Sequence, residues 1–227
     1  MDDLEFIVTS DGSHTLRNRR LNETYHSIHG ALRESEYVFV SNGLKFFHQA
    51  HPGGSISILE VGFGTGLNAW LTLLFARDNN VPVRYVTLEP FPLEEQIWSR
   101  LNYVQDDKAM FESLHRAPWG ESVEMHSTFA FKKLKSSLLD LDTSDTFDVI
   151  YFDPFAPSIQ PALWQLEALK KATDRLNPEG VFVTYSAKGQ LKRDLKALGL
   201  NVETLAGPPG KKEMVRASRG VGQSPRG

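Results

Sequence analysis

The chain has 227 residues, of which 41% are hydrophobic and 23% charged, an ordinary balance for one folded domain with a sizeable core. It contains no cysteine, which excludes disulfides, thiolate metal sites and a cysteine nucleophile. The net charge of −3 is unevenly spread, because nine Lys and Arg face only three Asp and Glu from Lys188 onward. Such a basic part indicates either a contact with a polyanion or an ordinary solvated surface.

The first 50 residues differ from the rest and are predicted to form an extension packed on the core. The N-terminus is acidic, and no run approaches the ~18 apolar residues that span a bilayer. The sequence therefore predicts a cytoplasmic protein without a membrane partner. Residues 5–9 and 37–40 are apolar enough to be predicted as strands, with polar chemistry between them.

Residues 51–218 alternate between strand and helix patterns. Short apolar runs predict strands at 57–61, 84–88, 122–126, 147–152 and 180–185. Breaker-free or proline-led segments predict helices at 67–76, 92–103, 161–176 and 190–198, with a turn at 177–180. Residues 202–205 and 213–217 would close the sheet as an antiparallel pair. This order predicts an α/β fold with a doubly wound, mostly parallel sheet, followed by a flexible tail at 219–227.

A glycine-rich loop follows the first of these core strands and opens a helix. It reads Gly62-Phe63-Gly64-Thr65-Gly66 and continues to Asn68. Glycines there let the chain turn tightly and let a ligand touch the backbone. The dinucleotide fingerprint needs its third glycine at 67, where this chain has leucine, and the phosphate-loop Gly-Lys-Ser/Thr is absent. With Glu60 on the preceding strand, the loop resembles the first motif of class I S-adenosylmethionine-dependent methyltransferases. A tight turn without ligand is the alternative.

Glu89 ends the second core strand and is followed by Pro90. It lies 23 residues after Gly66, close to the ~20-residue spacing of an adenosine-binding unit. A carboxylate at that strand end can accept hydrogen bonds from both ribose hydroxyls. The sequence therefore predicts a ribose contact, and a solvated loop carboxylate is the alternative.

The fourth core strand ends in Asp153-Pro154-Phe155, beside the expected cofactor loop. This tripeptide looks like the Asp-Pro-Pro-Tyr/Phe signature of amino-group methyltransferases. A carboxylate can accept N–H bonds, orient a nitrogen lone pair and attract its proton, while an aromatic ring offers a stacking face to a base. Asp153 and Phe155 are thus the predicted catalytic residues. A strand end with a proline turn and a core phenylalanine is the alternative.

The chain as a whole, from about residue 10 to about 218, resembles the methyltransferase half of the MnmC-type enzymes of tRNA modification. The resemblance is carried by residues 22–27 (Asn-Glu-Thr-Tyr-His-Ser), 30–35 (Gly-Ala-Leu-Arg-Glu-Ser), 38–44 (Val-Phe-Val-Ser-Asn-Gly-Leu), 61–68 (Val-Gly-Phe-Gly-Thr-Gly-Leu-Asn), 152–157 (Phe-Asp-Pro-Phe-Ala-Pro) and 207–214 (Gly-Pro-Pro-Gly-Lys-Lys-Glu-Met). Many relatives have Gly-Phe where this chain has Pro154-Phe155, which predicts a stiffer loop.

The resemblance implies methyl transfer from S-adenosylmethionine to the exocyclic amine of 5-aminomethyl-(2-thio)uridine at the tRNA wobble position. The tRNA anticodon region would then be the partner. The cofactor would be bound by Glu60, Gly62, Phe63, Gly64, Gly66, Asn68, Glu89 and Pro90, with Glu60 accepting from its ammonium group. The substrate would be bound by Tyr25, His26, Glu34, Asn42, Pro154, Lys211 and Lys212, with Arg216 near the RNA backbone. A structural histidine is the alternative for His26.

The relatives carry a flavin oxidase domain for which these 227 residues have no room, so the chain resembles the stand-alone methyltransferase. Another enzyme would then supply the aminomethyl substrate. A methyltransferase of a small-molecule or protein amine, and an inactive cofactor-binding adaptor, remain alternatives. No His-Glu-x-x-His motif or histidine cluster has metal-ligand spacing, and amine methylation needs no metal.

Overall fold

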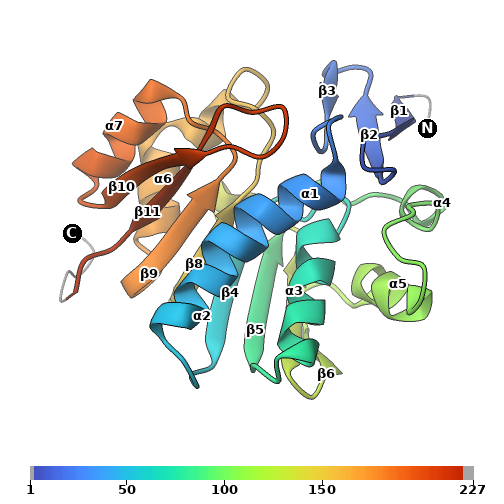
Figure 1. The fold of residues 1–227 in the computed structure, drawn as a ribbon, viewed down its shortest axis with the longest axis horizontal. Helices are drawn as coiled ribbons and strands as arrows, with labels where there is room; N and C mark the ends of the chain where they lie inside the picture. Colours follow the sequence, from blue (N-terminus) through green and yellow to red (C-terminus); the bar gives the residue numbers. More distant parts are fainter. Residues whose placement is uncertain (1–2, 222–227) are drawn as a thin grey trace.

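Eight strands of the computed structural model, which describes residues 3–221, form one central sheet in the order β10-β11-β9-β8-β4-β5-β7-β6 (Figure 1). Its parallel part consists of β4 (Ile56–Val61), β5 (Val83–Leu88), β7 (Phe129–Leu134), β8 (Phe147–Phe152) and β9 (Leu176–Thr184). At one edge β11 (Glu213–Ser218) lies antiparallel to β9, and β10 (Asn201–Ala206) lies antiparallel to β11. At the other edge β6 (Ser122–His126) lies antiparallel to β7. The predicted α/β class and the closing pair are confirmed.

Helices cover both faces of this sheet, so its inner strands are apolar on both sides. Ile58, Tyr85 and Tyr151 belong to one buried cluster, and their strand neighbours Leu59 and Ile150 belong to the other. This alternation is the two-residue period of a strand. Helices α3 (Leu67–Asp78) and α5 (Lys108–Arg116) cover the first face, and α6 (Leu166–Thr173) and α7 (Gly189–Ala197) cover the second (Figure 1).

Residues 31–50 form one continuous helix, so the predicted strand at 37–40 is wrong. The helix consists of α1 (Ala31–Ser35), the π-helical segment η1 (Glu36–Lys45) and α2 (Phe46–Ala50), and it packs on β8 and β9 beside α3. Strand propensity is overridden because the buried side chains recur with helical spacing. Gly43 brings this helix close to the sheet, since an added Cβ would lie 2.9 Å from Val183 Cγ2.

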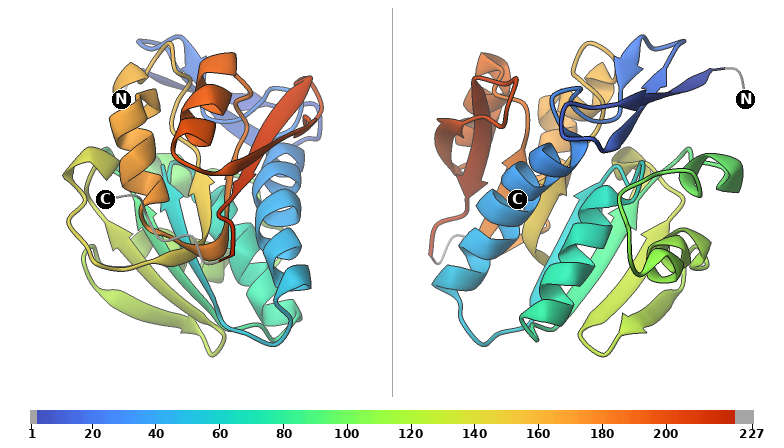
Figure 2. Two further views of the ribbon diagram at one scale, coloured as in Figure 1. Left: turned by 90° about the vertical axis from the view of Figure 1, so that its left-hand side faces the viewer. Right: turned by 45° about the vertical axis from the view of Figure 1, so that its right-hand side comes forward.

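A small three-stranded sheet precedes that helix. It contains β1 (Leu4–Val8), β2 (His14–Asn18) and β3 (Glu23–Thr24), all antiparallel. Figures 1 and 2 place it beyond the carboxyl ends of the central strands, where ligands bind in open α/β sheets. The strand predicted at 5–9 is confirmed as β1, shifted by one residue. The extension thereby delivers residues 24–27 to the carboxyl edge of the sheet.

Four further predictions are corrected along the chain. The helix predicted at 92–103 is only α4 (Glu95–Trp98), and that predicted at 161–176 is divided at the extended residue Gln165 into the 3₁₀ turn η3 (Pro161–Trp164) and α6. The predicted turn at 177–180 is an irregular part of β9, with Glu179 at φ 63°. The third parallel strand is β7, and the segment predicted for it is the antiparallel edge strand β6.

The predicted tail begins later than residue 219. Arg219 is buried, and its guanidinium donates to the Thr173 carbonyl at 2.5 Å. The remainder of the predicted tail, residues 222–227, lies outside the described residues. Among residues 3–221, no helix has the length and apolar character needed to cross a membrane.

Candidate functional site

A cavity of about 430 Å³ opens at the carboxyl ends of β4, β5 and β8 and is closed on one side by the N-terminal extension. This is the volume range of small-molecule and cofactor sites. Thirteen residues predicted for the site line it: Tyr25, His26, Glu34, Gly62, Phe63, Gly64, Asn68, Glu89, Pro90, Asp153, Pro154, Phe155 and Lys211. The topology therefore brings four loops and the N-terminal segment to one place.

The glycine loop between β4 and α3 has backbone angles that would be strained for residues with a side chain. Gly62 has φ 98° and Gly64 has φ 49°, both in the left-handed half of the map. A Cβ on Gly62 would lie 2.7 Å from the carbonyl oxygen of Asp153, and one on Gly64 would lie 3.2 Å from Tyr25 Cδ1. The two glycines let this loop lie directly against the strand-four loop and the N-terminal segment.

Two histidines hold Thr65 at the centre of this loop. His26 Nε2 lies 2.7 Å from the Thr65 hydroxyl, and His115 Nε2 donates to the Thr65 carbonyl at 3.1 Å. Burial lowers the pKa of His26 to about 4 and that of His115 to about 3, so both rings are neutral near pH 7. The ring of His115 also stacks on Trp98, with centroids 4.8 Å apart. His26 thus supports the loop from the cavity side.

Glu89 directly follows β5 and lies against the glycine loop. Its Oε2 accepts from the Gly64 amide at 3.0 Å, and its Oε1 accepts from the Phe91 amide at 2.8 Å. Burial raises its pKa, while these two amide bonds oppose that rise. The carboxyl is therefore fixed in orientation and lines the cavity, as a ribose contact requires.

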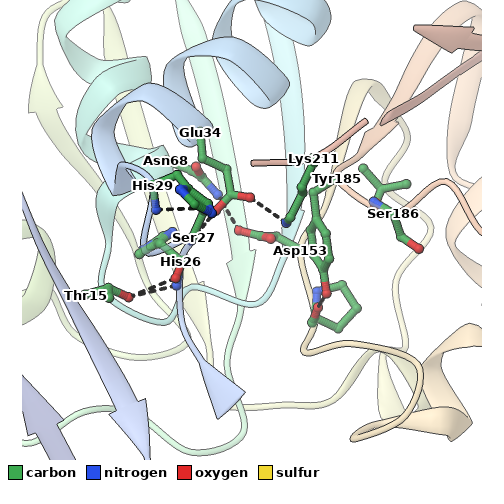
Figure 3. A network of polar contacts seen from close by, with 12 residues as sticks. Thr15, His26, Ser27, His29, Glu34, Asn68, Asp153, Tyr185, Ser186 and Lys211 are labelled. Carbon is green, nitrogen blue, oxygen red and sulfur yellow. Dashed lines mark hydrogen bonds and ion pairs between the residues drawn. The ribbon is translucent and has the colours of Figure 1, made fainter. Parts of the chain in front are cut away.

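Asp153 directly follows β8 and lines the cavity. Asn68, in the first turn of α3, donates from Nδ2 to Asp153 Oδ2 at 2.9 Å (Figure 3). Burial raises the pKa of Asp153 well above its usual range, and the carboxyls of Glu34 and Glu60 raise it further. A carboxyl with a raised pKa is a stronger proton acceptor than an ordinary aspartate.

Glu34, Lys211 and Tyr185 also surround Asp153 (Figure 3). Lys211 Nζ donates to Glu34 Oε1 at 2.5 Å and lies 3.8 Å from the centre of the Tyr185 ring. Glu34 Oε2 accepts from the Ser27 amide at 2.6 Å. The Glu34 carboxylate and the Tyr185 ring thus surround the ammonium group of Lys211, and this is the environment that a cationic amine prefers.

Phe155 follows in the strand-four loop, where its ring is partly exposed to the cavity. It meets the Tyr25 ring edge to face, with centroids 4.9 Å apart. Its backbone is held on both sides, because the amide donates to Gln160 Oε1 at 2.9 Å and the carbonyl accepts from Trp164 Nε1 at 2.8 Å. The loop therefore presents a rigid aromatic wall.

Four predicted residues do not line the cavity: Asn42, Glu60, Gly66 and Lys212. Asn42 lies on η1, where its side chain donates to the Tyr37 carbonyl. Glu60 is fully buried within the sheet and accepts from Thr87, so its placement does not support the predicted contact with the cofactor's ammonium group. Lys212 is exposed on the loop before β11.

Part of the predicted basic surface is paired with acidic side chains. Arg216 is only 11% exposed, forms an ion pair with Glu203 at 2.8 Å and lies over the Phe46 ring. Lys192 pairs with Glu213 at 3.3 Å. The charge excess of the C-terminal sequence is therefore partly neutralised by neighbouring acids.

Several residues that line the cavity were not predicted from the sequence. Tyr185 follows β9, and its hydroxyl donates to the Pro154 carbonyl at 2.8 Å. Ser136 and Ser137 follow the unpredicted strand β7, and Phe91 lies two residues after Glu89 with 79% of its surface exposed. All four lie just past a strand's carboxyl end, which is the signal that could have found them once the strands were known.

The described residues fit S-adenosylmethionine better than a metal ion. Between residues 3 and 221, no group of three or more His, Asp or Glu side chains is arranged to hold a metal. The glycine cradle, the fixed carboxyl of Glu89 and the cavity volume suit an extended nucleoside ligand.

Comparison with known families and sequences gives concordant results. Residues 104–220 match the model of a family described as S-adenosyl-L-methionine-dependent methyltransferase. The tRNA 5-methylaminomethyl-2-thiouridine biosynthesis bifunctional protein MnmC of Methylobacillus flagellatus is 28% identical over 85% of this chain and 32% of its own length. The protein of that name from Nitrosospira multiformis is 25% identical over 88% and 35%. The chain thus spans about a third of these relatives.

Solved structures show the same architecture. MnmC2 from Aquifex aeolicus superposes with a TM-score of 0.81 at 28% identity, covering 99% of this chain and 73% of that one. Spermidine synthase from Thermotoga maritima superposes with a TM-score of 0.62 at 16% identity, over 96% and 69%. The second likeness concerns the fold alone.

Proposed function

Because the chain belongs to the S-adenosyl-L-methionine-dependent methyltransferase family, we propose that it methylates the exocyclic amine of 5-aminomethyl-(2-thio)uridine at the wobble position of tRNA. The observation that carries the amine assignment is that Asp153 lines one cavity with Glu34 and Tyr185, which surround the ammonium group of Lys211. The names of the relatives, together with the 28% identity to MnmC2 over nearly the whole chain, support a tRNA substrate.

The glycine loop and Glu89 would hold the cofactor. Gly62 and Gly64 expose backbone to the methionine part, and Glu89 accepts from the ribose hydroxyls. S-adenosylmethionine, when bound, supplies an electrophilic methyl group. The neutral rings of His26 and His115 keep Thr65 and hence the loop in place without adding positive charge near a sulfonium.

Glu34, Tyr185 and Asp153 would bind the substrate amine in its ammonium form and then remove a proton, which makes the nitrogen lone pair available. Glu34 and the Tyr185 face attract the ammonium form, and this requires Lys211 to give up its present position. Asp153 accepts a proton from the nitrogen and then a hydrogen bond from a remaining N–H, which orients the lone pair. Asn68 keeps the Asp153 carboxyl fixed during this step.

The nucleobase would rest against Phe155, and Lys211, once displaced, is in reach of the RNA backbone together with Lys212. We infer that the partner is the anticodon region, because the wobble base must enter the cavity. An enzyme that forms the aminomethyl group must act before this one. A small-molecule or protein amine would fit the same acid–base arrangement and remains the competing acceptor.

Two tRNA pools distinguish these acceptors. Labelled S-adenosylmethionine is incubated with the protein and tRNA from cells blocked before the final methylation, and with fully modified tRNA as the matched control. The proposal predicts label in the first pool only. Label in neither pool, from a protein that binds the cofactor, would favour another amine acceptor.

A further inference from the structure

One cation lies among the carboxyls of the active-site cavity. Of the described residues that line this cavity, Lys211 alone carries a cationic side chain, and four carry a carboxyl: Glu23, Glu34, Glu89 and Asp153. Lys211 Nζ donates to Glu34 Oε1 at 2.5 Å and lies 3.8 Å from the centre of the Tyr185 ring. Its ammonium group therefore fills the space between Glu34 and Tyr185 that the substrate amine would take, the amine subsite.

The hairpin turn at 207–212, which joins β10 to β11, brings Lys211 to this position. The Lys211 amide donates to the Pro208 carbonyl at 2.9 Å, which closes the turn. Gly210, at φ 86°, lies so close to His29 that an added Cβ would overlap the imidazole ring. The backbone of the turn is thus held against the N-terminal segment, whereas the flexible four-carbon side chain of Lys211 can leave the subsite by rotation.

A tethered ammonium group competes strongly with free amines. Groups joined by a short flexible link act on each other at an effective concentration of about millimolar. Glu34 is buried, and its other hydrogen-bond partner among the described residues is the neutral Ser27 amide. Separation of the two charges is therefore costly. A free amine that enters the subsite replaces Lys211 on Glu34 but offers nothing to the displaced lysine.

An amine carried by RNA differs in this respect. The phosphate groups beside the wobble nucleotide are strong partners for a lysine ammonium group. Lys211 is partly exposed, so its side chain already extends from the cavity towards solvent. When the substrate amine takes its place on Glu34, Lys211 exchanges one anionic partner for another, and the cost of the displacement is offset.

We propose that Lys211 is a specificity-determining residue: it occupies the amine subsite in the free protein and yields this subsite to an amine attached to a polyanion in preference to a free amine. The inference rests on the proposed tRNA substrate. It adds to the sequence prediction, which assigned Lys211 to substrate binding, a role in the exclusion of other amines.

Lys211→Ala tests the proposal with two acceptors, undermethylated tRNA and the free nucleoside 5-aminomethyluridine. Wild type should strongly prefer the tRNA. In the variant, kcat/KM for the nucleoside should rise about tenfold or more, because a subsite that is free for about a tenth of the time binds its ligand about tenfold more weakly. The kcat/KM for tRNA should fall, because a phosphate contact is lost.

Lys192→Ala is the matched control. Lys192 pairs with Glu213 at 3.3 Å, beside the same hairpin turn, but does not line the cavity. Its replacement removes an ion pair from the hairpin and leaves Lys211 in the amine subsite, so kcat/KM for the nucleoside should equal that of wild type. Both variants are assayed well below their melting temperatures. No gain in Lys211→Ala, or an equal gain in Lys192→Ala, would overturn the proposal.

Occupation of the subsite can also be measured without methyl transfer. Ethylammonium chloride, compared with sodium chloride at equal ionic strength, should raise the melting temperature of Lys211→Ala by about 3–6 °C at a concentration about tenfold above its Kd. Wild type should show no rise, because Lys211 fills the subsite. Lys211→Ala combined with Glu34→Gln should show none either, because the carboxylate is gone.

Equal shifts in wild type and Lys211→Ala, or no shift in either, would contradict the occupation of the subsite by Lys211. Absent tRNA methylation by wild type would instead contradict the proposed function, and the ethylammonium comparison would still decide whether Lys211 occupies the subsite.

Discussion

The ion pair between Lys211 and Glu34 connects segments that lie 177 residues apart in the chain. Glu34 is 6% exposed and Lys211 is 32% exposed, so the pair is intermediate between a surface pair and a buried one. Among the described residues, Lys211→Ala leaves the buried Glu34 carboxylate with the Ser27 amide as its one hydrogen-bond partner. Surface pairs contribute about 0–1 kcal/mol and broken buried pairs cost about 3–5 kcal/mol, which suggests a loss of about 2 kcal/mol here.

For a chain of this length, such a loss lowers the melting temperature by about 4–8 °C. Lys212→Ala is the control, because Lys212 is adjacent and exposed. Calorimetry of the two variants should show a large shift for the first and almost none for the second. In addition, Glu34→Gln combined with Lys211→Ala should cost less than the sum of the single changes. Equal melting temperatures for the two lysine variants would refute the reasoning.

Three other predictions follow from the same structure. Asp153→Asn should lower single-turnover methylation by about 10²- to 10⁴-fold with cofactor affinity largely kept, and a normal rate would remove Asp153 from the chemistry. Gly43→Ala should lower the free energy of urea unfolding by about 1–3 kcal/mol because its Cβ would crowd Val183, whereas Gly54→Ala, whose Cβ would meet only the His51 carbonyl at 4.0 Å, should not; similar costs would contradict the close packing. Burial lowers the folded pKa of His115 to about 3, so stability from its neutral form is lost as pH falls below the unfolded value of 6.5. The advantage of wild type over His115→Gln should therefore shrink by about 1.4 kcal/mol per pH unit below about pH 6, and a pH-independent difference would contradict it.

Local sequence signals predicted much of the core. The first, second and fourth parallel strands are short apolar runs followed by glycine or an acid, and all three lie within a residue of their predicted bounds. Their carboxyl ends meet at one edge of a parallel sheet, so the sequence alone predicts that Gly62, Glu89 and Asp153 lie close together, and all three line one cavity.

The remaining features depend on contacts that local patterns do not contain. Strand β7 was not predicted because Lys132 and Lys133 interrupt its apolar pattern. Lys133 is nevertheless only 1% exposed, because its ammonium group donates to the His115 carbonyl and lies 4.5 Å from the Trp119 ring centre. Residues 37–40 have strand propensity, but they form part of a helix because their buried side chains pack on β8 and β9 with helical spacing. Glu60 follows the family pattern for a cofactor contact, and only its burial and its hydrogen bond with Thr87 of the neighbouring strand show that its carboxyl does not line the cavity.

Identification of the methylated nucleoside tests the central claim most directly. Undermethylated tRNA is incubated with the protein and labelled S-adenosylmethionine, digested to nucleosides and separated with mass detection. The proposed function predicts that the label moves with 5-methylaminomethyl-(2-thio)uridine and is absent with the Asp153→Asn variant. Label on any other nucleoside, or on none, would contradict it.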